Sequence, residues 1–398
     1  MFTMIYVNDL AGAGKIVPDW MVHFSDRHRR GSGMTFVDLV FPGFLFIVGL
    51  SIPFALGSRL KKGEPLWKIL LHVVIRTVSL LAIGILMVNE TPDSEQMGWS
   101  GELWCTLMYL SAIFAFCTIA PRGKTAPGER AKVFRIVSLA LQVLGIASLV
   151  WLAFAFRNKS GQAIISLSPF SIHREWYGIL GLIGWSYLVG ALVFLVFRGN
   201  RTALLGCFAL LLCLYPADRK HVFDNFWLAN YVGIGEMLGA HPSITMAGLL
   251  LASILIAPEM ASIGSKARFT LLFIAGCAAG ALLLNGLYGI SKNNATPSWC
   301  LWSCAITAAV WLPLYLVTDV RRVGLVAGPL AVAGQNVLLA YLISEMLPST
   351  LEVLHLGDWY DGLAGPTLVH AVARSIGCAA AILCATAGLN RLGFRLKL

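Results

Sequence analysis

The chain has 398 residues, of which 58% are hydrophobic and only 13% are charged, and its formal net charge is +10. Soluble domains carry about 25% charged residues, so this chain has too little polar surface to cover itself in water, and its mean hydropathy of +0.76 agrees. This composition excludes a soluble protein. The positive charges follow a membrane topology, which argues against nucleic-acid binding.

Eleven apolar segments are long enough, or nearly long enough, to cross a bilayer, whose hydrocarbon core needs about 20 helical residues. These segments are residues 35–57, 68–88, 103–120, 134–156, 176–197, 202–216, 243–258, 268–288, 300–318, 325–347 and 366–388. The opening MFTMIYV is too short to cross. We therefore predict an all-α fold, a polytopic membrane helix bundle of about 11 transmembrane helices plus a truncated first helix.

The basic residues of the loops predict how the chain crosses the membrane. When the loops alternate, 18 lysines and arginines fall on one side and 10 on the other, while Arg76 and Arg374 lie within spans. Basic loops stay in the cytoplasm. We predict one integral-membrane domain, 1–398, with a partial first helix (1–10), an extracytoplasmic loop (11–34), a helix bundle (35–388) and a cytoplasmic tail (389–398).

Two further patterns favour a structural interpretation. The nine cysteines lie almost entirely in apolar runs without a CxxC or His/Cys cluster, so we expect buried small side chains and no metal. The segment GIGEMLGAHPSITMAG (233–248) contains several glycines but lacks the pattern of a phosphate-binding loop. We interpret it as a loop that enters a closely packed helix.

One carboxylate stands at the start of the first full span, in DRHRRGSGMTFVDLVFPGFLFIVG (26–49). Ionisable groups at the ends of membrane helices are functional candidates, so Asp38 is either an active-site residue or a first-turn acid that matches the helix dipole. His28 is either a solvated loop residue or an imidazole that takes a proton or attacks an activated carbonyl. In the second case Asp26 or Asp38 would orient it.

Other polar residues lie inside the predicted spans. Arg76, with His72 one turn earlier, is a functional candidate that would bind an anionic ligand from the cytoplasmic side. The structural alternative is an ion pair, or an arginine that snorkels to the cytoplasmic surface. Arg374 repeats this pattern in the last span. Further polar groups in or at the ends of spans are Asn89, Asn336 and Glu345.

Several of these stretches together resemble the transmembrane acetyltransferase family of heparan-α-glucosaminide N-acetyltransferase and its bacterial relatives. His28 stands in the family position before GMTFVDLVFPGFLFIVGLSI, and YVND (6–9) provides Asn8. RTVSLLAIGILMVN (76–89) is similar to a second family helix, and GQNVLLAY (334–341) is a weaker match. The first helix is cut short relative to the family, so either the true start lies upstream of Met1 or the chain lacks half of this helix. An in-frame apolar extension in the genomic DNA would indicate the first alternative.

The resemblance implies transfer of an acetyl group from cytosolic acetyl-CoA to a sugar amine or hydroxyl on the extracytoplasmic side. His28, Asp38 and Asn8 are then the expected catalytic residues. Expected contacts of the acyl-CoA, whose phosphates suit arginine, are Arg76, Asn89 and Asn336. The expected partners are acyl-CoA, a carbohydrate-like acceptor and the lipid bilayer, without nucleic acid and with a homodimer left open. The expected location is a bacterial inner (plasma) membrane, with the C-terminus in the cytoplasm.

Two other functions stay open on the sequence alone. A transporter or permease for an anionic or sugar-like solute would line its pathway with Arg76 and Arg374, although the chain has no detectable repeats of the kind that many transporters carry. The second possibility is a catalytically degenerate relative with a structural role.

Overall fold

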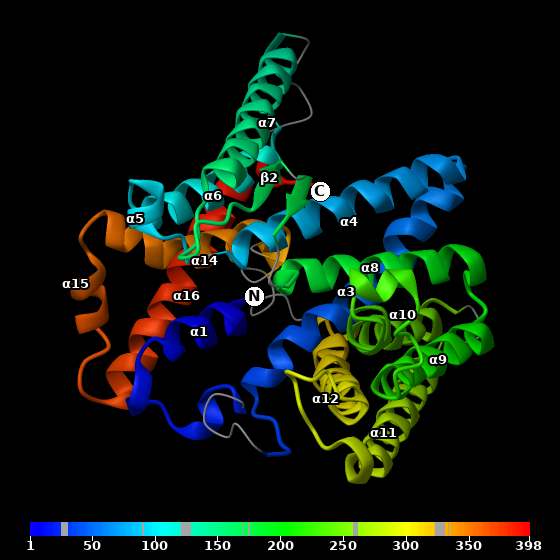
Figure 1. Cartoon of the computed structure of the whole chain (residues 1–398). Coiled ribbons are helices and arrows are strands. Elements are labelled where there is room, and N and C mark those ends of the chain that lie inside the picture. Colours follow the sequence, from blue (N-terminus) through cyan, green and yellow to red (C-terminus); the bar gives the residue numbers. More distant parts are fainter. Residues whose placement is uncertain are drawn as a thin grey trace. The chain divides into compact units, whose positions relative to one another are not determined.

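A computed structural model describes residues 1–24, 31–89, 91–120, 129–168, 170–173, 176–257, 262–322, 331–332 and 334–398. The chain is mostly helical (Figure 1), and the predicted all-α membrane fold is confirmed. In these described ranges, nine helices are long and apolar enough to cross a membrane. They are Val37–Lys61, Leu66–Met87, Ala131–Ala155, Gly178–Phe197, Arg201–Arg219, Ile234–Ile256, Ile263–Tyr288, Pro297–Val320 and Leu368–Arg391.

The two other predicted spans also contain helices, but shorter ones. These are α6 (Gly101–Ala115) and α14 (Val337–Val353), and residues 323–330, where the second was expected to start, lie outside the described residues. The span predicted at 243–258 starts earlier, because the π-helix η5 (Ile234–Ala240) runs directly into α10 (His241–Ile256). Its Glu, Gly and Pro residues lower the apolar signal without ending the helix.

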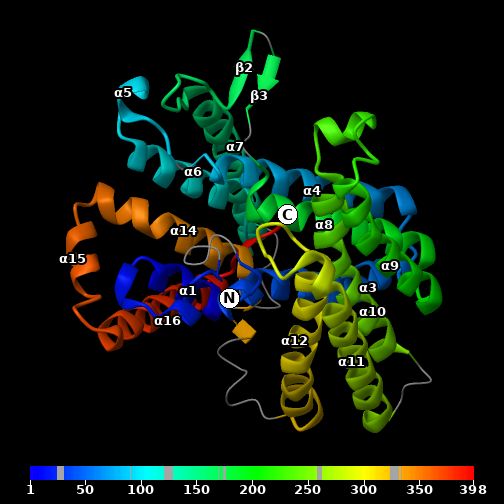
Figure 2. The same cartoon turned by 60° about the horizontal axis from the view of Figure 1, so that its bottom comes forward.

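The contacts of the chain separate it into two compact units, each described here by itself. Unit 2 comprises Asp19–Leu81 and Ile179–Arg322. Its elements are η2 (Asp19–Met21), η3 (Val37–Leu39), α3 (Val40–Lys61), most of α4 (Leu66–Met87), α8 (Gly178–Phe197), α9 (Arg201–Arg219), η4 (Trp227–Asn230), η5, α10, α11 (Ile263–Tyr288), α12 (Pro297–Tyr315) and η7 (Leu316–Val320). Helices α10, α11 and α12 run side by side in both views (Figures 1 and 2).

Helices α3 and α10 of unit 2 approach each other so closely that their backbones touch. A Cβ on Gly248 would lie 2.0 Å from the carbonyl oxygen of Phe46, and one on Gly49 would lie 1.8 Å from that of Thr245. Thr245 Oγ1 donates a hydrogen bond of 3.1 Å to the Leu45 carbonyl. Glycine is required on both helices, which confirms the close helix approach predicted for 233–248.

Unit 1 comprises Met1–Pro18, Ala82–Gly178 and Val323–Leu398. Its elements are α1 (Phe2–Ala11), η1 (Gly14–Ile16), α5 (Ser94–Met97), α6, β1 (Cys117–Ile119), α7 (Glu129–Ala155), β2 (Ile165–Leu167), β3 (Phe170–Ile172), α14, α15 (Gly357–Gly362), α16 (Leu368–Arg391) and β4 (Phe394–Leu396). The antiparallel pairs β1–β4 and β2–β3 were not predicted, because three residues are too few for an alternating pattern. The N-terminal residues for which a helix was predicted form helix α1.

A buried ion pair fastens α1 to α16 in unit 1, where the two helices lie together (Figures 1 and 2). Arg374, whose side chain is 3% exposed, donates from Nε to Asp9 Oδ2 at 3.2 Å, and Ser375 Oγ donates to the same oxygen at 2.6 Å. Tyr360 donates to Asp9 Oδ1 at 2.5 Å. Burial and the Asp9 carboxylate raise the pKa of Tyr360, so its phenol stays a donor. Arg374 therefore forms an ion pair with Asp9, as the structural interpretation of this arginine requires.

Candidate functional site

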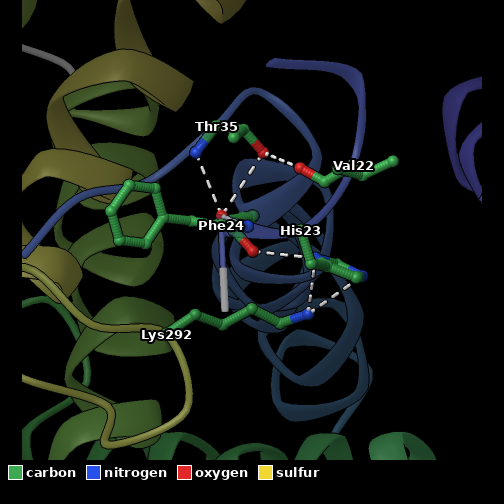
Figure 3. Close-up of polar contacts among 6 residues, drawn as sticks. Val22, His23, Phe24, Thr35 and Lys292 are labelled. Atoms are coloured by element: carbon green, nitrogen blue, oxygen red, sulfur yellow. Dashed lines mark hydrogen bonds and ion pairs between the residues drawn. The ribbon is translucent and has the colours of Figure 1, made fainter. Parts of the chain in front are cut away.

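Asp38 lies in η3 at the start of the first full span of unit 2, with only 1% of its surface exposed. The backbone N–H groups of Phe24 and Thr35 donate to its Oδ2 at 3.1 and 3.0 Å. Thr35 Oγ1 lies 3.3 Å from the same oxygen but donates its proton over a shorter distance, 2.7 Å, to the Val22 carbonyl (Figure 3). A buried charge must be hydrogen-bonded, and these bonds supply that need. They also fix the orientation of the carboxylate.

The contacts of Asp38 are compatible with both of its predicted roles, the acid of a first helical turn and the active-site residue. Asp38 stands three residues after Thr35 and reaches back to its N–H, as the acid of a capping box does. The capping contact occupies Oδ2 alone. The other oxygen, Oδ1, is left to contact a side chain.

That side chain is His23, which the sequence did not single out. His23 Nδ1 lies 2.7 Å from Asp38 Oδ1, and the His23 side chain is 31% exposed whereas that of Asp38 is 2% exposed. A buried carboxylate behind a half-exposed imidazole is the arrangement that orients a catalytic histidine, because the carboxylate fixes the ring and its tautomer. Phe24, the next residue, anchors the same segment through its N–H.

Lys292 completes the cluster from the loop between α11 and α12. Its Nζ lies 3.2 Å from His23 Nδ1 and 3.3 Å from His23 Nε2 (Figure 3). Two loops hold it there: Gly33 N–H donates to the Ile290 carbonyl at 2.9 Å, and Ile290 N–H donates to Ser32 Oγ at 2.7 Å. Residues 257 and 258 positions apart in sequence are thus joined by hydrogen bonds beside the site.

The loop that carries Lys292 is itself held by several internal hydrogen bonds. Thr296 Oγ1 accepts from the Ser291 N–H at 3.0 Å and donates to the Gly289 carbonyl at 3.0 Å, and Ser298 Oγ also donates to that carbonyl. Gly289 has a φ of +64°, a backbone conformation that favours glycine.

The other predicted site residues are distributed over both units. His28 lies outside the described residues. In unit 1, Asn8 donates to Glu345 Oε1 at 2.9 Å and Asn89 donates to the Ile85 carbonyl of its own helix at 2.8 Å. Asn336 holds β4, donating to the Phe394 carbonyl at 3.1 Å and accepting from the Leu396 N–H at 3.1 Å. These contacts give the three asparagines structural roles, and their catalytic and cofactor roles stay predictions.

Arg76 lies in the part of α4 that belongs to unit 2. Of the described residues predicted to contact acyl-CoA, it is the one with an unpaired buried hydrogen-bond donor. Its guanidinium lies 4.7 Å from the centre of the Tyr187 ring, and its buried Nε has no hydrogen-bond partner among the described residues. A buried guanidinium N–H without a partner fits a phosphate oxygen. Within the same described residues, no group of three or more His, Cys, Asp or Glu side chains could hold a metal ion.

Unit 2 also has a cavity of about 510 Å³ further along α3. It is lined by Leu50, Phe54, Leu255, Ile256, Lys266, Trp311, Tyr315 and Asp319. At 1.5 Å per helical residue, Leu50 and Phe54 lie about 20 Å along the helix from Asp38. Cavities of this size accommodate a small organic ligand.

Known proteins that match this chain agree with the resemblance seen in the sequence. A sequence family described as "Domain of unknown function (DUF5009)" matches residues 1–162, which include His23 and Asp38. The heparan-alpha-glucosaminide N-acetyltransferase of Mus musculus is 30% identical over 164 residues, and that of Homo sapiens is 32% identical over 99 residues. The expected resemblance is confirmed.

The extent of these matches is limited. They cover 38% of this chain and 24% of the mouse protein, and 25% of this chain and 14% of the human protein. The chain thus spans about a quarter or less of the length of these curated relatives. The likeness to a transmembrane acetyltransferase suggests the class of protein, while substrates and site residues are matters for proposal.

Proposed function

We propose that this protein is a membrane acyltransferase that moves an acetyl group from acyl-CoA on the cytoplasmic side to a sugar amine or hydroxyl on the other side. The observation that carries the proposal is the buried carboxylate of Asp38, fixed by two backbone N–H groups and paired at 2.7 Å with a half-exposed histidine. An imidazole oriented in this way serves as base or nucleophile in acyl transfer. The relatives named N-acetyltransferase support the reaction class.

Two features of unit 2 support a donor route from the opposite end of α3. The cavity at Leu50 and Phe54 lies along α3, which follows Asp38, and its described lining includes one cation, Lys266, and one anion, Asp319. Arg76 offers an unpaired buried N–H to a phosphate. We propose that the cavity belongs to the route of the acyl-CoA and that Arg76 contacts its phosphates, which are the chemistry that a guanidinium binds best.

The function is tested with the purified full-length chain in proteoliposomes. Radiolabelled acetyl-CoA is added with glucosamine as the acceptor, and labelled N-acetylglucosamine is measured. Asp38→Asn is expected to abolish transfer. The matched control Asp224→Asn, at an acid that is 64% exposed and paired with the exposed His221, is expected to leave transfer unchanged. Equal transfer by both variants would remove Asp38 from the site.

A thermal-shift measurement separates this function from that of a permease. Coenzyme A and acetyl-CoA are expected to raise the unfolding temperature, because they bind the folded state. Stabilisation by a sugar or an anion alone would instead support a transporter. The pairing of Arg374 with Asp9 weighs against the transporter, since that arginine was expected to line the pathway and its guanidinium is engaged.

A further inference from the structure

The position of Lys292 over His23 differs from that of a simple hydrogen-bond partner. A lone pair of an imidazole nitrogen points outward in the plane of the ring, so a donor bound to it lies close to one nitrogen and far from the other. Lys292 Nζ is instead almost equally far from both, at 3.2 and 3.3 Å. The ammonium therefore lies over the ring face and does not occupy the in-plane edge of Nε2.

Asp38 determines what that edge can do. Its buried Oδ1 is an acceptor 2.7 Å from Nδ1, which places the proton of a neutral ring on Nδ1 and the lone pair on Nε2. The imidazole thus presents a basic lone pair at Nε2, with an ammonium beside it. A base and a cation held about 3 Å apart on hydrogen-bonded loops are the two groups that acyl transfer requires.

We propose that His23 and Lys292 are the catalytic pair of this protein, His23 as general base and Lys292 as the donor that stabilises the oxyanion. This inference rests on the proposed acyl transfer and deepens it. Neither residue was expected from the sequence, in which His28 occupies the family position.

The pair accounts for each atom of the transfer. His23 Nε2 takes a proton from the acceptor amine or hydroxyl as its nitrogen or oxygen bonds to the thioester carbonyl carbon, whose oxygen becomes negative. Lys292 Nζ–H donates to that oxygen, and Asp38 balances the imidazolium. When the carbonyl re-forms, the carbon–sulfur bond breaks, and the departing CoA sulfur takes the proton from His23 Nε2. The products are the acylated acceptor and CoA thiol.

The hydrogen bonds that hold the Lys292 loop distinguish this role from that of a flexible surface lysine. The Gly33–Ile290 and Ser32–Ile290 hydrogen bonds join it to the segment that carries Thr35 and Asp38. An oxyanion donor is effective only when it is already in place, because reorganisation during the reaction costs free energy. The same contacts that build the loop therefore position the cation.

The test measures steady-state kinetics with acetyl-CoA and glucosamine for His23→Gln, His28→Gln, Lys292→Met and Lys292→Arg in the full chain. His23→Gln is expected to lower kcat by about 10²- to 10⁴-fold, the usual contribution of a general base. Lys292→Met is expected to lower kcat by about 10²- to 10³-fold with KM unchanged, the usual contribution of an oxyanion donor. Lys292→Arg should recover part of that loss.

Two controls separate chemistry from folding. His221→Gln, a histidine whose side chain is 80% exposed, and the exposed Lys220→Met should keep wild-type kinetics. Free imidazole should restore part of the activity of His23→Gly, which a purely structural histidine would not allow. Unfolding temperatures of all variants are recorded beside the rates.

The outcomes are distinguishable. Loss of activity in His28→Gln with wild-type activity in His23→Gln would overturn the assignment of His23 while leaving the acyltransferase intact. A change of KM alone in Lys292→Met would overturn the role of Lys292. A wild-type protein that transfers no acetyl group to any amine or hydroxyl acceptor would refute the proposed function itself, and this inference with it.

Discussion

Replacing Asp38 by Asn keeps the size of the side chain and removes its charge, and the surrounding donors determine how the new amide lies. The N–H groups of Phe24 and Thr35 both point at Oδ2. The amide oxygen must therefore take that position, which turns the NH₂ group toward His23 Nδ1. Two donors cannot face each other, so the ring must take the tautomer with its proton on Nε2, and the base is lost.

The expected magnitudes follow from this geometry. Fixing the wrong tautomer of an oriented imidazole lowers kcat by about 10⁴-fold, which corresponds to about 5.5 kcal/mol in the activation free energy. The fold loses much less, because both backbone N–H groups keep an acceptor. Weakening hydrogen bonds to a charged group costs about 1–2 kcal/mol of unfolding free energy.

Activity and stability of Asp38→Asn are therefore measured together, by acetyl transfer and by thermal unfolding in detergent. Asp38→Ala serves as the comparison, since it leaves the N–H groups of Phe24 and Thr35 without an acceptor and is expected to unfold at a lower temperature than Asp38→Asn. Wild-type kcat in a folded Asp38→Asn protein would refute the orienting role of the carboxylate.

Three further predictions concern packing, the buried ion pair and the cavity. Gly248→Ala should destabilise unit 2 by at least about 1–3 kcal/mol, because its Cβ meets the Phe46 carbonyl. Gly57→Ala, whose nearest neighbour is Phe194 Cζ at 3.8 Å, should be tolerated; equal melting of the two variants would contradict the close approach. Arg374→Met should lower the free energy of unfolding by about 3–5 kcal/mol, because it leaves the Asp9 carboxylate buried and unpaired. Asp9→Asn combined with Arg374→Met should recover part of this loss. A loss below about 1 kcal/mol for Arg374→Met alone would show that the ion pair is not needed. Leu50→Trp, which places a larger side chain in the cavity lining, should raise KM for acetyl-CoA roughly tenfold, a loss of about 1.4 kcal/mol in binding. The control Leu282→Trp, at a position 63% exposed on α11, should leave KM unchanged. An unchanged KM in Leu50→Trp would exclude the cavity from the route of acyl-CoA.

Much of the fold was readable from the sequence because membrane helices are specified by composition over long windows. Each of the eleven predicted spans contains a helix in the described residues. The errors lie where composition is mixed: η5 and α10 form one span despite Glu236 and His241, and α6 is too short to be counted with the long apolar helices. The strand pair β1–β4 depends on hydrogen bonds between residues about 280 positions apart, which no local pattern encodes.

The site was only partly predictable for a related reason. Asp38 was identified because a carboxylate at the end of an apolar helix is rare. His23 and Lys292 carry no such signal, since a histidine in a loop and a lysine in a polar turn are ordinary. Their juxtaposition depends on the hydrogen bonds between Gly33, Ser32 and Ile290, which only the folded chain brings together. Asn8 was chosen from the family pattern, and its contact with Glu345 became visible only in the structure.

Sidedness of the product tests the central proposal most directly. Sealed vesicles of one orientation are loaded with glucosamine, radiolabelled acetyl-CoA is added only outside, and the vesicles are separated and counted. Acyl transfer through the membrane predicts labelled N-acetylglucosamine inside the vesicles, with all CoA thiol outside and no label inside when Asp38→Asn replaces the wild-type chain. Label that stays outside, or that enters equally in the Asp38→Asn vesicles, would contradict the account.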